Sequence, residues 1–209
     1  MTATLEAEPA VAVELFGEEV EVARAFARNL AAQGEELGLI GPGELPRLWS
    51  RHILNCAIVA PLLRPGLVGD VGSGAGLPGL VLAIARPDVS FVLIEPMERR
   101  VAWLTGQVAA LGLTNTTVVR ARAEELRLLH RLDQVTARAV SAFRTLIPLT
   151  APLLRVGGEL VLMKGAGASA EVEAAAKAIR KFRLRNVEVI TLGEGVLHDV
   201  TRVIRATVD

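Results

Sequence analysis

The stretch Asp70-Val-Gly-Ser-Gly-Ala-Gly-Leu-Pro-Gly79 (DVGSGAGLPG) carries two overlapping glycine patterns directly after an apolar run. Gly72, Gly74 and Gly76 form G-x-G-x-G, whereas Gly74, Gly76 and Gly79 form G-x-G-x-x-G, the spacing of a dinucleotide-binding loop. Because glycine lacks a Cβ atom, either pattern lets the backbone turn sharply and approach a ligand closely. Neither pattern identifies the ligand alone, so the surrounding sequence must decide between them.

Around this loop, short β-rich apolar runs alternate with longer helical patterns, which predicts a parallel sheet covered by helices. The predicted strands are 67–71, 90–95, 116–121, 133–138, 158–163, 186–192 and 200–207, and the predicted helices are 77–86, 97–112, 123–131, 142–155 and 169–183. Only the GEGVLHD loop separates the last two strands, so we expect an antiparallel hairpin. Seven strands with a closing hairpin are the α/β layout of the class I S-adenosylmethionine-dependent methyltransferase fold, whereas a dinucleotide-binding domain continues with a parallel sixth strand. This layout favours G-x-G-x-G.

A helical extension precedes the predicted sheet. Apolar residues recur at helical spacing at Phe16, Val20, Ala23, Ala27 and Leu30, and a second helix is predicted over 48–63, with a loop over 34–46 between them. We therefore expect an N-terminal helical extension over 1–64 and a methyltransferase core over 65–209. The extension either caps one edge of the core or also shapes a substrate entrance, and the sequence favours neither.

Composition narrows the class of protein. A chain of 209 residues that is 51% hydrophobic can bury one substantial core. Its one cysteine, Cys56, excludes an intramolecular disulfide and a cysteine-cluster metal site, and we expect no metal. The start MTATLEAEPA lacks a signal-peptide pattern and charged residues, Gly and Pro interrupt every apolar run, which predicts a cytoplasmic protein with no membrane partner.

The charge distribution is uneven, although the formal net charge is zero. Residues 1–21 carry six Glu and neither Lys nor Arg, which leaves 23 basic and 17 acidic side chains in residues 22–209. This part of the chain is mildly basic, which is compatible with a nucleic-acid partner but does not identify one.

In the G-x-G-x-G interpretation, the loop lies under the methionine moiety of S-adenosylmethionine. Asp70 is expected to hold the cofactor ammonium directly or through water, and Glu95, at the end of the second strand, to accept the ribose hydroxyls. NAD sites use the same carboxylate, so Glu95 does not discriminate between the cofactors. Ala123 and Glu124 are candidates for the adenine edge, although a glutamate there also suits a helix N-terminus. The predicted cofactor residues are Asp70, Gly72, Ser73, Gly74, Gly76, Leu77, Glu95, Ala123, Glu124 and Arg138.

Six ordered blocks resemble the RsmG family, also called glucose-inhibited division protein B. They are RHILN (51–55), DVGSGAGLPGL (70–80), RRVAWL (99–104), LGLTNTTVVRARAEE (111–125), VTARAV (135–140) and LLRVGGELVLMKG (153–165). The resemblance implies methylation of guanine N7 in bacterial small-subunit ribosomal RNA, with S-adenosylmethionine as donor. It carries the cofactor site onto Gly72, Leu77, Ala123, Glu124 and Arg138, with the ribose carboxylate at Glu95. The family commonly has H-[IL]-L-D-S where this chain has HILNC, and its N-L-T block survives only as Asn29-Leu-Ala31.

The end of the fourth predicted strand and the residues after it read Thr136-Ala-Arg-Ala-Val140, which lacks the N-P-P-Y type tetrapeptide of amino-group methyltransferases. Guanine N7 instead carries a lone pair and no proton, so its methylation needs no general base. We expect Arg138 to orient the acceptor guanine or the cofactor, with an ion pair to Glu95 or Asp133 as the structural alternative.

The predicted RNA-binding residues lie near strand ends or loop entrances, and they are Arg51, His52, Arg99, Arg122, Phe143, Lys164 and Arg202. Phe143 is either a base-stacking or a core side chain, and His52 either contacts RNA or is hydrogen-bonded on a helix face. We expect a monomer whose partner is small-subunit ribosomal RNA or the ribosomal subunit. A small-molecule methyltransferase and a nucleotide-binding regulatory module without turnover are the alternatives.

Overall fold

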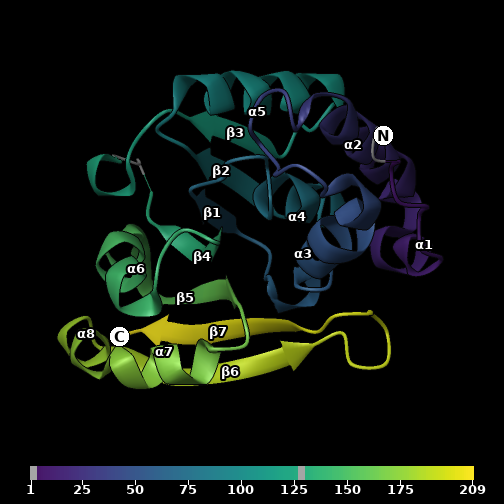
Figure 1. Ribbon diagram of the computed structural model, residues 1–209. Coiled ribbons are helices and arrows are strands. Elements are labelled where there is room, and N and C mark those ends of the chain that lie inside the picture. The colour runs from purple at the N-terminus through teal and green to yellow at the C-terminus, as the bar shows by residue number, and fades with distance from the viewer. Residues whose placement is uncertain (1–3, 127–129) are drawn as a thin grey trace.

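The computed structural model describes residues 4–126 and 130–209 and has a seven-stranded sheet at its centre (Figure 1). The strands are β1 (Leu67–Val71), β2 (Ser90–Ile94), β3 (Thr116–Val119), β4 (Leu132–Arg138), β5 (Leu154–Lys164), β6 (Leu184–Leu192) and β7 (Thr201–Val208). Their order is β3-β2-β1-β4-β5-β7-β6. Neighbouring strands from β3 to β5 are parallel, and β7 is antiparallel to both β5 and β6. This topology confirms the predicted class I methyltransferase fold and its closing hairpin.

Most of the core helices lie where the periodicity predicts them. They are α4 (Gly79–Ala85), α5 (Glu98–Ala110), α6 (Phe143–Thr150), α7 (Ala168–Ala174) and α8 (Ala176–Lys181), with a 3-10 turn η6 (Ala151–Leu153) after α6. The predicted helix 123–131 is wrong in its described part, because only the 3-10 turn η5 (Ala123–Glu125) forms there. Leu126 turns to extended backbone and buries its side chain. Residues 127–129 of this prediction lie outside the described residues.

The N-terminal extension is built from shorter pieces than its periodicity predicts. It contains α1 (Val11–Phe16), η1 (Gly17–Glu19), α2 (Val20–Gln33), η2 (Leu45–Arg47), the π-helix η3 (Leu48–Leu54), α3 (Asn55–Ala57) and η4 (Ala60–Leu62). The predicted helix 48–63 is therefore three segments, the last of which is a 3-10 turn around Pro61. A proline lacks the N–H that a continuous helix requires, which accounts for this final break.

Two apolar layers cover the two faces of the sheet. Along β2, Phe91 and Leu93 belong to one layer and Val92 and Ile94 to the other, as the two-residue period of a strand requires. The first layer joins the sheet to α4, α5 and the N-terminal extension, and the second joins it to α6, α7 and α8. In Figure 1 the N-terminal helices accordingly lie on the right of the sheet and α6 and α8 on the left. The extension thus shares one continuous core with the sheet.

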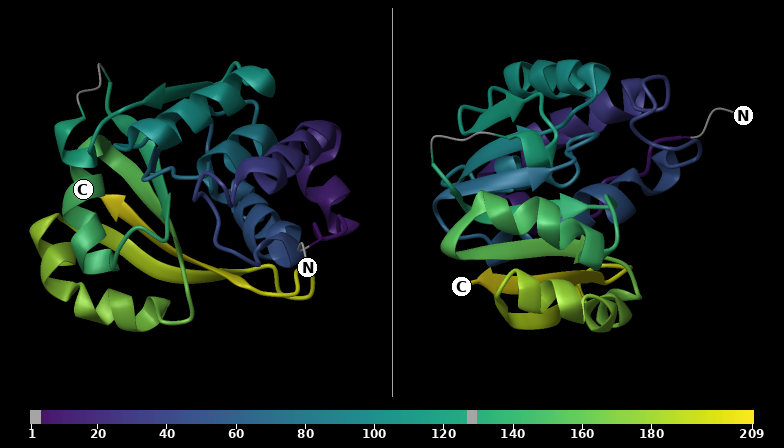
Figure 2. Two further views of the ribbon diagram at one scale, coloured as in Figure 1. Left: turned by 45° about the horizontal axis from the view of Figure 1, so that its top comes forward. Right: turned by 90° about the vertical axis from the view of Figure 1, so that its left-hand side faces the viewer.

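The parallel strands bring four chain segments together at their carboxyl ends. The glycine loop follows β1, Glu95 follows β2, Arg138 ends β4 and Lys164 ends β5. The carboxyl ends of an open parallel sheet are where ligands bind in this architecture. The β6–β7 loop lies near the N-terminal segment in the left view of Figure 2. Glu6 and Pro9 of that segment line one cavity together with Leu197 of the loop. Among the described residues, no helix is long and apolar enough to cross a membrane.

Candidate functional site

The glycine loop uses both glycine patterns, but for different reasons. Gly72, Gly74 and Gly76 have φ angles of 74°, 55° and 92°, in the left-handed region that favours glycine. Gly79 lies in α4, and a Cβ atom there would lie 2.4 Å from both Asp70 Oδ2 and Leu93 Cδ2. The G-x-G-x-G pattern therefore shapes the loop, and the last glycine of the other pattern lets α4 approach the sheet.

Asp70 lies beneath this loop and is fully buried. Its Oδ2 accepts a hydrogen bond from the Gly79 amide at 3.1 Å, and its Oδ1 has no partner among the described residues. Burial raises the pKa of the Asp70 carboxyl to about 7, and the nearby Glu95 carboxylate adds to this effect. The structure thus gives Asp70 a bracing position, and its contact with a cofactor ammonium stays a prediction.

Glu95 and Trp103 fasten the loop from two further elements. The Glu95 carboxylate, 2% exposed, accepts hydrogen bonds from the amides of Gly74 and Met97, both at 3.0 Å. Trp103 Nε1, on α5, donates to the carbonyl of Ala75 at 3.0 Å. The loop is thus fixed to the end of β2 and to α5 by hydrogen bonds within the protein itself. This bracing was not predicted for Glu95, whose ribose contact stays a prediction.

A cavity of about 300 Å³, here called the loop cavity, opens over the glycine loop. Its walls include Gly72–Ala75 and Leu77 from the loop side, and Glu44 and His52 from the extension. Arg100, on α5, also lines it, and the Arg100 Nε is buried with no hydrogen-bond partner among the described residues. Sequence reasoning missed Arg100 and Glu44, although Arg100 lies in the RRVAWL block.

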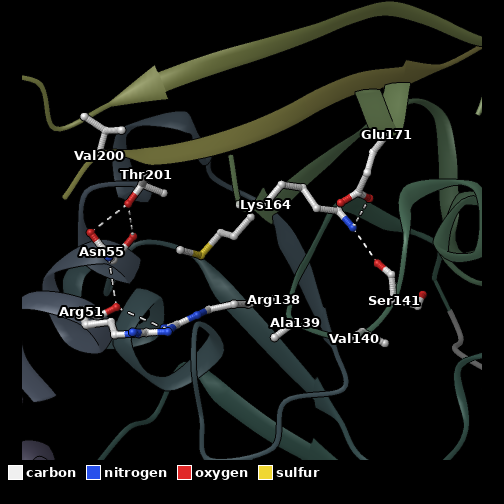
Figure 3. Close-up of a pocket in the computed structure, with 12 residues that line it drawn as sticks. Arg51, Asn55, Arg138, Ala139, Val140, Ser141, Lys164, Glu171, Val200 and Thr201 are labelled. Carbon is white, nitrogen blue, oxygen red and sulfur yellow. Dashed lines mark hydrogen bonds and ion pairs between the residues drawn. The ribbon is translucent and has the colours of Figure 1, made fainter. Parts of the chain in front are cut away.

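A second cavity of about 500 Å³, here called the strand-end cavity, lies at the carboxyl ends of β4 and β5 (Figure 3). The side chains that line it include Arg51, Asn55, Arg138, Ser141, Lys164 and Glu171. Arg138 and the following Ala139 line both cavities. The structure therefore brings Arg51, Arg138 and Lys164 together, at a point where two cavities share one wall.

Polar contacts fix two of these side chains in the wall of the strand-end cavity. Lys164 Nζ donates to the carbonyl of Ser141 at 2.6 Å and lies 2.9 Å from Glu171 Oε2, as Figure 3 shows. Asn55 donates to the carbonyl of Arg51 at 3.1 Å, and its Oδ1 accepts from Thr201 Oγ1 at 3.1 Å. The cavity therefore has both hydrogen-bond donors and a carboxylate at fixed positions.

The Arg138 guanidinium points toward the N-terminal extension. Its Nη2 lies 2.7 Å from His52 Nδ1, and its Nη1 donates to the His52 carbonyl at 3.3 Å and to Cys56 Sγ at 3.2 Å. The ion pair proposed as an alternative is wrong, because Glu95 accepts backbone amides and Asp133 pairs with Arg155 at 2.6 Å. Arg138 is thus held by neutral groups of the extension.

Several predicted residues lie elsewhere or have other surroundings. The stacking role of Phe143 needs correction, because its side chain is 0% exposed within the second apolar layer. Both ring nitrogens of His52 have protein partners, Glu44 and Arg138, which leaves neither for a phosphate.

Ala123 and Glu124 line a separate cavity of about 470 Å³, together with Pro148 and Pro152 of the α6 region. Their adenine contact stays a prediction.

The remaining predicted cations are spread over the surface. Arg99 is exposed in the first turn of α5, and Arg122 is exposed before η5. Arg202 lies on β7 directly opposite Lys164 of β5. Only Arg202 is therefore a neighbour of the strand-end cavity by register, and the RNA contacts of all three stay predictions.

The sequence of this chain matches a known protein family and several of its members. The family model described as GidB, rRNA small subunit methyltransferase G, matches residues 19–200. The "Ribosomal RNA small subunit methyltransferase G" of Leifsonia xyli is 75% identical over 208 residues, which covers 100% of both chains. The protein of the same name from Clavibacter michiganensis is 70% identical over 98% of this chain and 97% of its own.

Solved structures share the fold at much lower sequence identity. A SAM-dependent methyltransferase from Aquifex aeolicus is 16% identical with a TM-score of 0.54, covering 97% of this chain and 95% of its own. The N-methyltransferase NodS from Bradyrhizobium japonicum, in complex with S-adenosyl-L-homocysteine, is 15% identical with a TM-score of 0.57, covering 84% and 97%. With its seven-stranded sheet, its G-x-G-x-G loop and these relatives, the chain belongs to the GidB, or RsmG, family of rRNA small subunit methyltransferases G.

Proposed function

We propose that this chain transfers a methyl group from S-adenosylmethionine to N7 of a guanine in small-subunit ribosomal RNA. The observation that carries the proposal is the wall that Arg138 and Ala139 contribute to both the loop cavity and the strand-end cavity. A donor in the first cavity and an acceptor in the second would meet at this wall. The names of the relatives supply the polymer class, small-subunit ribosomal RNA.

The loop cavity fits the methionine end of the cofactor. Glycines at Gly72 and Gly74 expose backbone at the cavity wall, and Arg100, which also lines the cavity, carries a guanidinium that can donate to a carboxylate. S-adenosylmethionine, when bound, supplies an electrophilic methyl group on a sulfonium ion. The proposed cofactor residues are Asp70, Gly72, Ser73, Gly74, Gly76, Leu77, Glu95, Ala123, Glu124 and Arg138, and we add Arg100 because it lines the loop cavity.

The strand-end cavity suits a guanine that attacks without a general base. The N7 atom has a lone pair and no proton, so alignment of N7 with the methyl group supplies most of the rate. Arg138 and Lys164 offer donors for the guanine O6, and Glu171 offers an acceptor for its Watson–Crick edge. Arg138 orients the base and takes no proton. The target guanine must be unstacked to reach this cavity.

The N-terminal extension, residues 1–64, is proposed to complete the site. It contributes Arg51 and Asn55 to the strand-end cavity and Glu44 to the loop cavity, and His52 also reaches the loop cavity. This supports the interpretation of the extension as part of the substrate entrance, in addition to its packing on the core over 65–209. We further propose that the protein acts as a cytoplasmic monomer.

The test is nucleoside mass spectrometry of small-subunit ribosomal RNA after incubation with the purified protein and methyl-labelled S-adenosylmethionine. Naked RNA and intact subunits are compared in parallel. We expect label in 7-methylguanosine, and the better of the two substrates shows which surface is recognised. Label in another nucleoside would overturn the acceptor atom. Cofactor binding without label in either substrate would favour a small-molecule acceptor or a regulatory module.

A further inference from the structure

Arg138 is held by a chain of hydrogen bonds that ends on a carboxylate of the extension. Arg138 Nη2 lies 2.7 Å from His52 Nδ1, and His52 Nε2 lies 2.6 Å from Glu44 Oε2. The three residues come from β4, the π-helix η3 and the segment just before η2. Since Arg138 lines both cavities, this chain links the site wall to a part of the molecule that precedes the sheet in sequence.

The partners of the imidazole fix its tautomer. A guanidinium only donates hydrogen bonds, so His52 Nδ1 must accept from Arg138 and carry no proton. The remaining ring proton is then on Nε2, which donates to the Glu44 carboxylate. A neutral ring with its proton on Nε2 is therefore the state that the geometry requires.

The charges around His52 favour this neutral state. Burial lowers the pKa of His52, and the Arg138 and Arg51 guanidinium groups lower it further, while the Glu44 carboxylate opposes them. The pKa of Glu44 is itself lowered, despite its burial, by hydrogen bonds from Arg47 and His52. Other polar groups near this chain are the Cys56 thiol, which Arg138 also contacts, and Arg100, which lines the same cavity.

We propose that His52 and Glu44 are positioning residues that orient the Arg138 guanidinium at the wall between the two cavities, and that protonation of His52 removes this support. A protonated ring would present an N–H at Nδ1 toward the Arg138 N–H groups, so the hydrogen bond would be replaced by repulsion between two cations. The link from Arg138 to guanine methylation rests on the proposed function, whereas the positioning of Arg138 does not.

Two substitutions at position 52 separate the two ends of the imidazole. His52→Asn keeps an oxygen at the Nδ1 position, where it can accept from Arg138, and loses the reach to Glu44. His52→Gln keeps an amide group at the Nε2 position, near Glu44, and loses the acceptor for Arg138. We expect His52→Gln to lower the kcat for ribosomal RNA methylation at least about tenfold and His52→Asn clearly less, with Glu44→Gln between them.

A double-substitution cycle tests whether these effects pass through Arg138. In an Arg138→Ala background, His52→Gln should cause less than a twofold further loss of kcat. His198→Gln is the matched control, because this histidine is exposed in the β6–β7 loop, and its kcat should equal that of the unsubstituted protein. Equal fractional losses from His52→Gln with and without Arg138 would overturn the positioning role.

A measurement on the protein without substrate tests the positioning independently of catalysis. Nitrogen-15 NMR of the His52 ring should report a proton on Nε2 and a pKa below 6.5, the ordinary value for histidine. Arg138→Ala should raise that pKa, because it removes a neighbouring cation and the donor to Nδ1. A proton on Nδ1, or a His52 pKa unchanged by Arg138→Ala, would overturn the proposal even if methylation is confirmed.

The pH dependence of kcat tests the proposed effect of His52 protonation. The activity of the unsubstituted protein should fall on the acidic side as His52 protonates, and His52→Asn should lose this limb. A fall in activity caused by protonation of the buried Asp70 carboxyl would remain in His52→Asn, so this variant distinguishes the effect of Asp70 from that of His52. An acidic limb that is identical in both proteins would overturn the protonation step. If no 7-methylguanosine forms at all, the proposed function fails, and the NMR result alone decides the positioning.

Discussion

The amide nitrogen of Gly79 lies 3.1 Å from Asp70 Oδ2, and a Cβ atom on Gly79 would lie 2.4 Å from that same oxygen. The first residue of α4 is therefore pressed against a buried carboxylate near the end of β1. The same hydrogen bond satisfies one of the backbone amides that a helix N-terminus leaves unpaired. The close approach fixes where α4 begins and, with it, the end of the glycine loop.

Gly79→Ala should lower the free energy of unfolding by about 1–3 kcal/mol, the range for an added methyl group in a packed interior. Both the Asp70 carboxylate and the Leu93 side chain would have to move to admit the new Cβ. Urea denaturation followed by circular dichroism measures the change.

The control for this substitution is Gly106→Ala in α5, where nothing lies within 4 Å of an added Cβ. Alanine favours a helix over glycine by roughly 0.5–1 kcal/mol, so this variant should be as stable as the parent or more so. If the two variants have the same free energy of unfolding, the close contact between α4 and Asp70 does not restrict position 79 to glycine.

Gly72→Ala should weaken S-adenosylmethionine binding about tenfold, which corresponds to about 1.4 kcal/mol. The backbone φ of 74° disfavours alanine, and the new Cβ, on a residue that lines the loop cavity, would lie 2.8 Å from Val140 Cγ2. Isothermal titration calorimetry measures the affinity.

Gly17→Ala is the control for backbone strain alone, because Gly17 has a φ of 54° with nothing within 4 Å of an added Cβ. It should lose stability, by roughly 1–2 kcal/mol, without losing cofactor affinity. Equal affinities for both variants would argue against a cofactor contact at Gly72.

The sequence predicts the sheet well because buried parallel strands leave a strong local signal. β1 was predicted at its observed bounds, and the antiparallel closing hairpin follows from a loop too short for a crossover helix. The helix predicted over 123–131 is wrong in its described part. A glutamate-rich stretch suits a helix N-terminus locally, but the turn ends at Leu126, whose side chain is buried and whose backbone is extended. Tertiary packing therefore determines the conformation of this segment, and local sequence preference does not.

The site was predictable only in part, for a related reason. Arg138 and the glycine loop are visible because they lie at the ends of recognisable strands. Glu44 and Arg100 are not, since they reach the loop cavity from the extension and from α5, and their spacing from the glycine loop carries no signal. Phe143 illustrates the opposite error, because an aromatic residue after a strand end turns into the core as α6 begins.

Glu95→Gln should destabilise the protein by about 1–3 kcal/mol even without cofactor, measured by urea denaturation. The two carboxylate oxygens accept hydrogen bonds from the Gly74 and Met97 amides. Glutamine replaces one of these oxygens with an NH2 group, so that a side-chain donor would face a backbone donor. If Glu95 only bound the ribose hydroxyls, Glu95→Gln would lower the cofactor affinity and leave the stability of the free protein unchanged. The comparison of the two measurements therefore separates loop bracing from cofactor recognition.

Asp70→Asn should change how stability depends on pH. Burial raises the pKa of the folded Asp70 carboxyl to about 7 from an ordinary value of 3.8, so between these values the folded state binds more protons than the unfolded state. Its contribution is therefore favourable below about pH 4 and is lost as the pH rises toward 7, with a slope of up to about 1.4 kcal/mol per pH unit. Asparagine resembles the protonated acid and does not titrate. The difference in unfolding free energy, variant minus parent, should thus rise from about pH 4 to 7 and become constant above about pH 8. A difference that is flat across this range would mean that the Asp70 carboxyl titrates normally in the folded protein.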